Sequence, residues 1–90
     1  MMEHELKTWP IYFEMVRCSM KTFEMRLDDR DPPFTEGDTL FLREWNPATD
    51  RYTGRALTVG VTLALRGAPI IPDGYCAMQV MIIERTPDTQ

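Results

Sequence analysis

The sequence predicts a small α+β fold that is mainly β: a five-stranded, mostly antiparallel β-barrel with one helix after the first strand. Five segments have strand character, and loops rich in proline, glycine and aspartate separate them. A single segment, residues 10–19, has apolar residues at helical spacing instead. Closure into a barrel is expected because it removes the unpaired strand edges that a small sheet would otherwise expose.

The first strand, residues 4–9, leads directly into the helix. Pro10 suits the first turn of a helix, because its missing N–H would have no partner there in any case. Thr8 is a candidate capping residue just upstream. The predicted core-facing stripe of the helix consists of Tyr12, Phe13 and Val16.

The next strand, residues 21–27, alternates between apolar and polar side chains. Alternation places successive side chains on opposite faces of a sheet. We therefore expect one face to join the core, formed by Phe23, Met25 and Leu27. The other face is polar and carries Thr22, Glu24 and Arg26.

Three more strands are expected at residues 39–45, 55–65 and 75–84. The turn-rich stretch between the first two predicts a hairpin, with Trp45 and Tyr52 pairing across its loop. Loops at residues 28–37 and 67–74 contain prolines that exclude regular structure. The polar tail, residues 86–90, is expected to be disordered.

Length and charge limit the functions that are open to the chain. Ninety residues form a single domain, residues 1–90, and the net charge is −4. Proteins that bind a long phosphate backbone usually carry a basic stripe, so extended DNA or RNA binding is not expected. The two cysteines, Cys18 and Cys76, fit reduced and buried thiols in a cytoplasmic protein. No segment has the length of a membrane span.

A series of short motifs runs through most of the chain. They are His4-Glu5-Leu6-Lys7, Tyr12-Phe13, Lys21 to Arg26, Asp29-Arg30-Asp31, Gly37-Asp38-Thr39-Leu40, Glu44-Trp45, Tyr52-Thr53-Gly54-Arg55 and Gly74-Tyr75. Together these motifs resemble a known family, the small ASCH-type proteins of bacteria and their phages that are catalogued as a domain of unknown function.

The wider ASCH pattern is Gly-x-Lys-x-x-Glu-x-Arg, and this chain matches it at Lys21, Glu24 and Arg26, with Ser19 in place of the glycine. The resemblance implies a PUA-like fold and RNA-related binding, often of one extruded or modified nucleotide. Some small ASCH proteins are amidohydrolases that remove the acyl group of N4-acetylcytidine. Those enzymes carry a threonine three residues after the lysine, where this chain has Glu24.

Lys21, Glu24 and Arg26 are accordingly the first site candidates. Arg26 can hold a phosphate or a base edge with two parallel hydrogen bonds, and Glu24 can accept a hydrogen bond from an exocyclic amino group. Lys21 can neutralise a phosphate or, in an enzyme, act as a base or nucleophile with Glu24 as its acid–base partner. The alternative is a solvated ion pair of Glu24 and Arg26 on the strand surface.

Further ligand-binding candidates are His4, Lys7, Asp29, Arg30 and Tyr75. His4 is the chain's one imidazole, and its alternative is an exposed residue near the chain start. Tyr75 follows Gly74 where a loop enters the last strand, which suits stacking on a base. The aspartates at positions 28–31 lack the pattern of a calcium loop, so neither a metal nor another cofactor is expected.

The first functional hypothesis is a module that binds a nucleotide, a modified nucleobase or a short single-stranded RNA in a small polar pocket. The first alternative is a small amidohydrolase that acts on N4-acylated cytidines. The second alternative is a phage-encoded protein that binds a host factor, because a mildly acidic chain is compatible with mimicry of nucleic acid.

Overall fold

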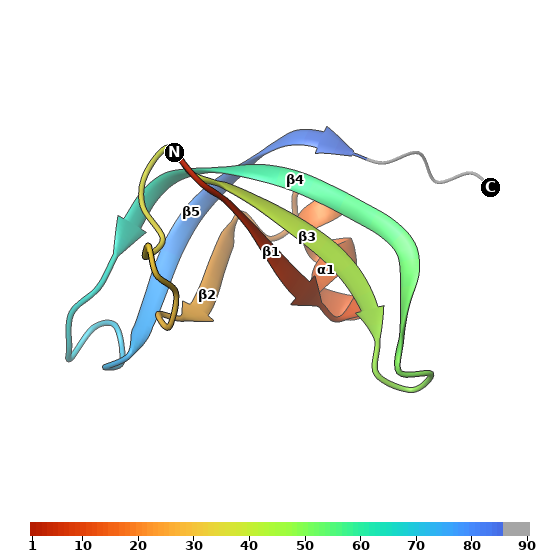
Figure 1. The fold of residues 1–90 in the computed structure, drawn as a ribbon, viewed down its shortest axis with the longest axis horizontal. Helices are drawn as coiled ribbons and strands as arrows, with labels where there is room; N and C mark the ends of the chain where they lie inside the picture. The colour runs from red at the N-terminus through yellow and green to blue at the C-terminus, as the bar shows by residue number, and fades with distance from the viewer. Residues whose placement is uncertain (86–90) are drawn as a thin grey trace.

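A five-stranded sheet curls into a half-barrel around one short helix in the computed structural model, which describes residues 1–85 (Figure 1). The tail expected at residues 86–90 lies outside the described residues. The predicted order of one strand, one helix and four further strands is confirmed. The elements are β1 (Glu3–Thr8), α1 (Pro10–Arg17), β2 (Phe23–Leu27), β3 (Thr39–Asn46), β4 (Arg51–Leu65) and β5 (Tyr75–Arg85).

The sheet has the strand order β1-β3-β4-β5-β2. Only the β1–β3 pair is parallel in the described residues, so the mostly antiparallel prediction is confirmed. A closed barrel, by contrast, is not what forms, because β1 and β2 are the two edges of the sheet and do not pair. Side chains rather than a strand ladder span the seam between these two edges.

The curl of the sheet arises along β4, which is 15 residues long and arches over the molecule (Figure 1). Its ladder with β5 shifts register after Thr58 and again after Val61. A further shift separates Arg43 from Trp45 in the β3–β4 ladder. Such irregularities bend a strand and increase its local twist, which brings β1 and β2 round toward each other.

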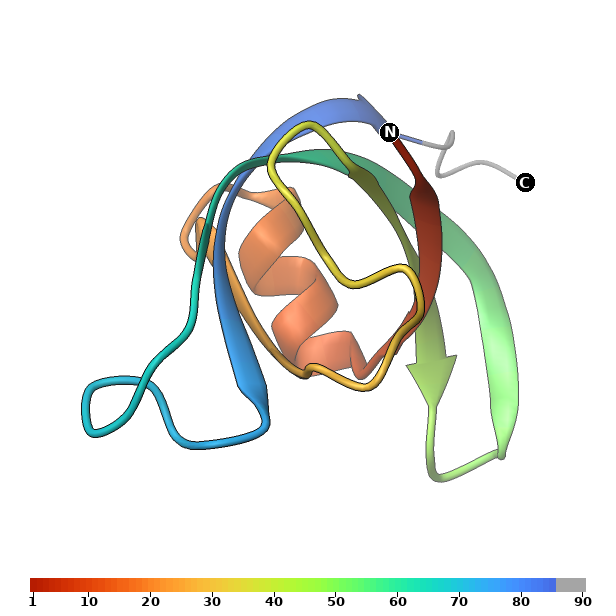
Figure 2. The ribbon, with the colours of Figure 1, turned by 60° about the vertical axis from the view of Figure 1, so that its left-hand side comes forward.

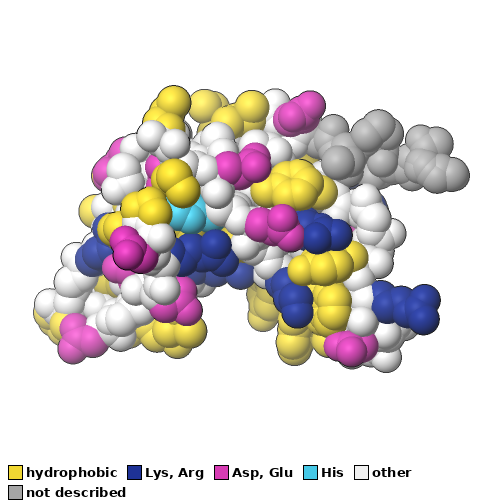
Figure 3. All heavy atoms as spheres, in the orientation of Figure 1, with side chains coloured by type: hydrophobic (Ala, Val, Ile, Leu, Met, Phe, Trp, Pro, Cys, Tyr) yellow, Lys and Arg dark blue, Asp and Glu magenta, His cyan; other side chains and the backbone are white. Residues whose placement is uncertain are grey.

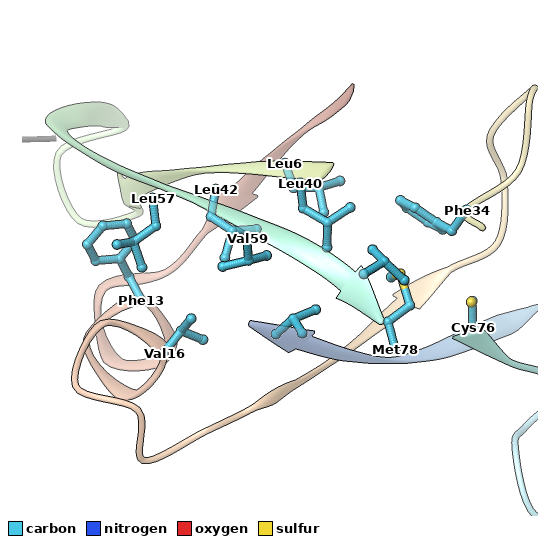
Figure 4. Close-up of a cluster of buried hydrophobic side chains, with 12 residues drawn as sticks. Leu6, Phe13, Val16, Phe34, Leu40, Leu42, Leu57, Val59, Cys76 and Met78 are labelled. Carbon is cyan, nitrogen blue, oxygen red and sulfur yellow. The ribbon is translucent and has the colours of Figure 1, made fainter. Parts of the chain in front are cut away.

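The helix α1 lies inside the curl, while the loop between β2 and β3 runs across the open side (Figure 2). Phe13 and Val16 of α1 point toward the inner faces of β3 and β4 (Figure 4). From the loop, Phe34 fills the opposite end of the same core and is fully buried. The core cluster comprises Leu6, Phe13, Val16, Phe34, Leu40, Leu42, Leu57, Val59, Val61, Cys76, Met78 and Val80.

The helix ends two residues earlier than predicted, at Arg17 rather than residue 19. Ser19 adopts a φ of 63°, in the left-handed region where glycine is favoured and where helices commonly stop. The backbone at Ser19 therefore has a conformation that glycine adopts without strain. The early end leaves Cys18 exposed, which corrects the expectation of two buried thiols; Cys76 is buried.

The hairpin between β3 and β4 is tighter than predicted, because β4 begins at Arg51 instead of residue 55. Asp50 supplies the left-handed residue of the turn, with a φ of 57°. Trp45 and Tyr52 pair across the ladder in an edge-on contact with ring centroids 4.9 Å apart, as expected. Within residues 1–85 no helix is both long enough and apolar enough to cross a membrane.

Candidate functional site

Strand β2 presents its charged face to the interior, the reverse of the prediction. Glu24 is only 2% exposed, whereas the three apolar side chains expected in the core are exposed, namely Phe23, Met25 and Leu27. The register with β5 explains the inversion, because Glu24 pairs with Met78 and paired residues share a face of the sheet. Met78 belongs to the core, so Glu24 must face inward beside it.

Glu24 is buried as a charge with a cation on each carboxylate oxygen. Lys21 Nζ lies 3.0 Å from Oε2, and Arg26 Nε lies 2.9 Å from Oε1. The side chains of both cations are mostly buried. The alternative of a solvated surface pair therefore does not hold: a carboxylate removed from water in this way depends on its partners for stability.

Arg26 also crosses the seam between the two sheet edges. Its Nη1 donates to the carbonyl oxygen of Lys7 at 2.9 Å, and its Nη2 donates to Thr8 Oγ1 at 3.1 Å. Further along the seam, Arg30 Nη2 donates to the carbonyl oxygen of Glu5 at 3.0 Å. Lys and Arg side chains gather between β1 and β2 beside a hollow in the surface (Figure 3). These contacts substitute for the missing ladder.

A cavity of about 430 Å³ opens beside the seam. Its polar floor holds two cations and one carboxylate, while Trp9 and Tyr12 of the helix start offer half-exposed aromatic rings. Its volume falls within the range of small-molecule sites, and its excess of positive charge suits an anionic group. The lining residues are Lys7, Thr8, Trp9, Tyr12, Lys21, Phe23, Glu24, Met25 and Arg26.

Four of the predicted site residues come together in this cavity: Lys7, Lys21, Glu24 and Arg26. Sequence reasoning missed part of the aromatic wall, since Tyr12 had been assigned to the core. It had also assigned Thr8 to capping, yet Trp9 is the N-cap of α1 and Thr8 accepts a hydrogen bond from Arg26 instead. The spacing of three between Trp9 and Tyr12 was the available signal, because residues three apart share a face of a helix.

His4 lies near the start of β1 and does not line the cavity. It is buried rather than exposed, with Nε2 2.9 Å from Asp38 Oδ2 and its ring 4.7 Å from that of Phe34. Burial would raise the pKa of Asp38, but hydrogen bonds from the Met2 N–H, His4 and the Thr35 N–H hold that pKa below its ordinary value. The pair fastens β1 to the loop before β3.

The remaining three candidates are also outside the cavity. Arg30 donates a hydrogen bond to the Glu5 carbonyl oxygen, and its guanidinium lies over the Phe34 ring, 5.6 Å from the ring centroid. Asp29 is exposed in the loop after β2, and Tyr75 lies opposite Leu27 on the outer face of the sheet. In the described part of the chain, no three His, Cys, Asp or Glu side chains gather in a way that could hold a metal ion.

Two comparisons with known proteins bear on this site. Residues 3–80 match the family described as Domain of unknown function (DUF3850), and that range contains every residue lining the cavity. The "Uncharacterized 12.9 kDa protein in GpA 3'region" of Escherichia phage P2 is 37% identical over 59 residues, which cover 66% of this chain and 50% of the phage protein. The chain thus spans about half the length of that curated relative.

Proposed function

The chain belongs to the family described as Domain of unknown function (DUF3850), and we propose that it is a binding module for a single nucleotide or modified base, in RNA or free. The cavity carries the proposal, because it combines a buried charged floor with aromatic walls at one opening. A base needs a flat apolar surface to stack on, and its phosphate needs cations. Both are present within about 430 Å³.

The fold supports a closer relationship with the ASCH domains and their PUA-like architecture. The order of elements is that of the proposed barrel, and Lys21, Glu24 and Arg26 of the ASCH pattern form the cavity floor. Ser19 adopts a left-handed conformation at the glycine position of the pattern. We propose the PUA-like assignment on these grounds.

Binding is favoured over hydrolysis by how the charged side chains are occupied. The Lys21 ammonium donates both to the carbonyl oxygen of Phe23 at 2.7 Å and to Glu24 at 3.0 Å. Each carboxylate oxygen of Glu24 already has a cation beside it. A nucleophile or general base needs a free electron pair directed at the substrate, which neither residue offers in this arrangement.

The test is a titration of the protein with the four nucleoside 5′-monophosphates, N4-acetylcytidine and short single-stranded RNAs. Tyr12→Ala removes an exposed aromatic ring from the cavity wall, and Tyr75→Ala removes a comparable ring from the outer face. Loss of one stacking partner should raise Kd by roughly tenfold or more for Tyr12→Ala and leave Tyr75→Ala unchanged.

Two results would count against the proposal. The proposal is refuted if none of the probes binds at millimolar concentration. It is also refuted if the two tyrosine substitutions change Kd equally. Release of acetate from N4-acetylcytidine, abolished by Lys21→Ala, would replace the binding module with an amidohydrolase.

A further inference from the structure

One edge of β2 pairs with no strand, and the hydrogen-bond pattern shows which of its main-chain groups lie on that edge. Thr22 accepts a hydrogen bond from the N–H of Val80 at 3.0 Å, and the N–H of Asp28 donates to Gly74 at 2.8 Å. In an antiparallel ladder, alternate residues make both bonds to the partner strand. Even-numbered residues of β2 therefore face β5. The N–H and C=O of Phe23, Met25 and Leu27 point away from it.

Three of the edge carbonyls along this seam are already occupied. The Phe23 oxygen accepts from Lys21, and across the seam the oxygens of Lys7 and Glu5 accept from arginines. A partner strand adding to either edge would have to displace these cations, so strand addition is blocked. Met25 is different: it lines the cavity, and nothing in residues 1–85 hydrogen-bonds to its N–H or its C=O.

We infer that the main chain of Met25 reads the pairing edge of the base, an inference that rests on the proposed nucleotide site. One residue at a strand edge projects its N–H and C=O in the same direction, as a donor next to an acceptor. Every nucleobase has an acceptor beside a donor on its Watson–Crick edge, which is where proteins read unpaired bases. The ring lies between the edge of β2 and the aromatic residues of the helix start, and the positive charge of Lys7, Lys21 and Arg26 attracts the phosphate to the cavity.

This geometry narrows the class of ligand. All four bases satisfy a single donor and acceptor, so Met25 supplies affinity for an unpaired base rather than a choice among the four. A methyl group on the ring nitrogen of the pairing edge removes a donor or an acceptor and blocks the approach. The site therefore takes nucleotides whose pairing edge is free, including those modified elsewhere on the ring, and rejects edge-methylated ones.

The test replaces single amide bonds in the synthesised 90-residue chain. An ester in place of the Met25 amide removes its N–H while keeping the side chain. An ester at Leu27 is the matched control, because Leu27 lies on the same strand edge but does not line the cavity. Both esters weaken the β2–β5 ladder equally, through the carbonyl of the preceding residue. Thermal unfolding of the two variants checks that equality.

The probe is whichever nucleoside 5′-monophosphate the natural chain binds most tightly. We expect the ester at Met25 to raise its Kd about tenfold and the ester at Leu27 to leave it unchanged. A second measurement needs no altered protein: the same nucleotide methylated at N1 of a purine or N3 of a pyrimidine should bind at least tenfold more weakly.

The outcomes separate the inference from the function on which it rests. If the natural chain binds none of the four nucleotides, the proposed function fails and the inference fails with it. If it binds one of them, but the methylated form binds equally well or the two esters behave alike, edge reading by Met25 is overturned and the nucleotide site stands.

Discussion

Replacing Arg26 by methionine tests whether the buried charges hold the fold together. The substitution keeps most of the aliphatic chain and removes three contacts: the ion pair with Glu24, and the hydrogen bonds to the Lys7 carbonyl and to Thr8. Glu24, with its side chain only 3% exposed, would keep Lys21 as its cation.

The expected loss follows from the burial of the pair. Removing one partner of a buried ion pair costs about 3–5 kcal/mol. The guanidinium side chain is 23% exposed and Lys21 remains, so we expect the free energy of unfolding to fall by about 3 kcal/mol, the lower end of that range. For a domain of this size, each kcal/mol lowers Tm by about 4–8 °C, so Tm should fall by about 12–24 °C.

Thermal and urea unfolding measure this loss. Arg43→Met is the matched control, because Arg43 pairs with Glu5 at the same 2.9 Å but both side chains are well exposed. Exposed pairs contribute less than about 1 kcal/mol. If Arg26→Met costs no more than Arg43→Met, the idea of a buried, partner-dependent Glu24 is refuted. In a double-mutant cycle, Glu24→Gln with Arg26→Met should cost less than the sum of the single substitutions.

Three further predictions concern the rest of the fold. Because the folded-state pKa of Asp38 is lowered from its ordinary 3.8, its contribution to stability is present above about pH 4 and is lost as pH falls through the folded value; Asp38→Asn should flatten that acid limb of an unfolding-versus-pH series. Burial raises the pKa of the Cys76 thiol, so iodoacetamide should label exposed Cys18 in the native protein and reach Cys76 only on unfolding. Equal labelling of the two cysteines in the native protein, measured by mass spectrometry, would contradict the fold. Leu27→Thr should change the free energy of unfolding by about 0.5 kcal/mol or less, whereas Leu42→Ala should cost about 3 kcal/mol; similar losses in urea unfolding would place Leu27 in the core after all.

Local pattern was sufficient to predict the strands and the helix, because periodicity and turn residues act over a few positions. Alternation in β2 predicted a strand with two unlike faces, and both the strand and the two faces are present. Alternation does not say which face is inside, however. That choice depends on the register with β5, whose paired residues lie 48 to 56 positions later in the chain. Hydrophobicity alone predicts the wrong inner face, because the buried charge of Glu24 is compensated by Lys21 and Arg26.

Only part of the cavity lining could be predicted from the sequence, because the lining also depends on contacts between residues far apart in the chain. Lys21, Glu24 and Arg26 stood out as charged residues in a recognisable pattern, whereas Tyr12 of the aromatic wall was assigned to the core-facing stripe of the helix and Trp9 to the first strand. Tyr12 has the spacing of a core residue, yet its side chain is half-exposed while Phe13 and Val16 of the same predicted stripe are buried. The burial of His4 likewise depends on Asp38, a partner 34 positions away.

The seam between β1 and β2 is a gap whose width depends on side chains. A ring of strands that is closed by main-chain ladders has a circumference fixed by peptide geometry, whatever the side chains are. Here the gap between β1 and β2 is spanned by the side chains of Arg26 and Arg30, so a single substitution can widen or narrow it. Of the two, only Arg26 lines the cavity, so a relative with a different side chain at position 26 would keep the same strand ladders and bind a ligand of a different size.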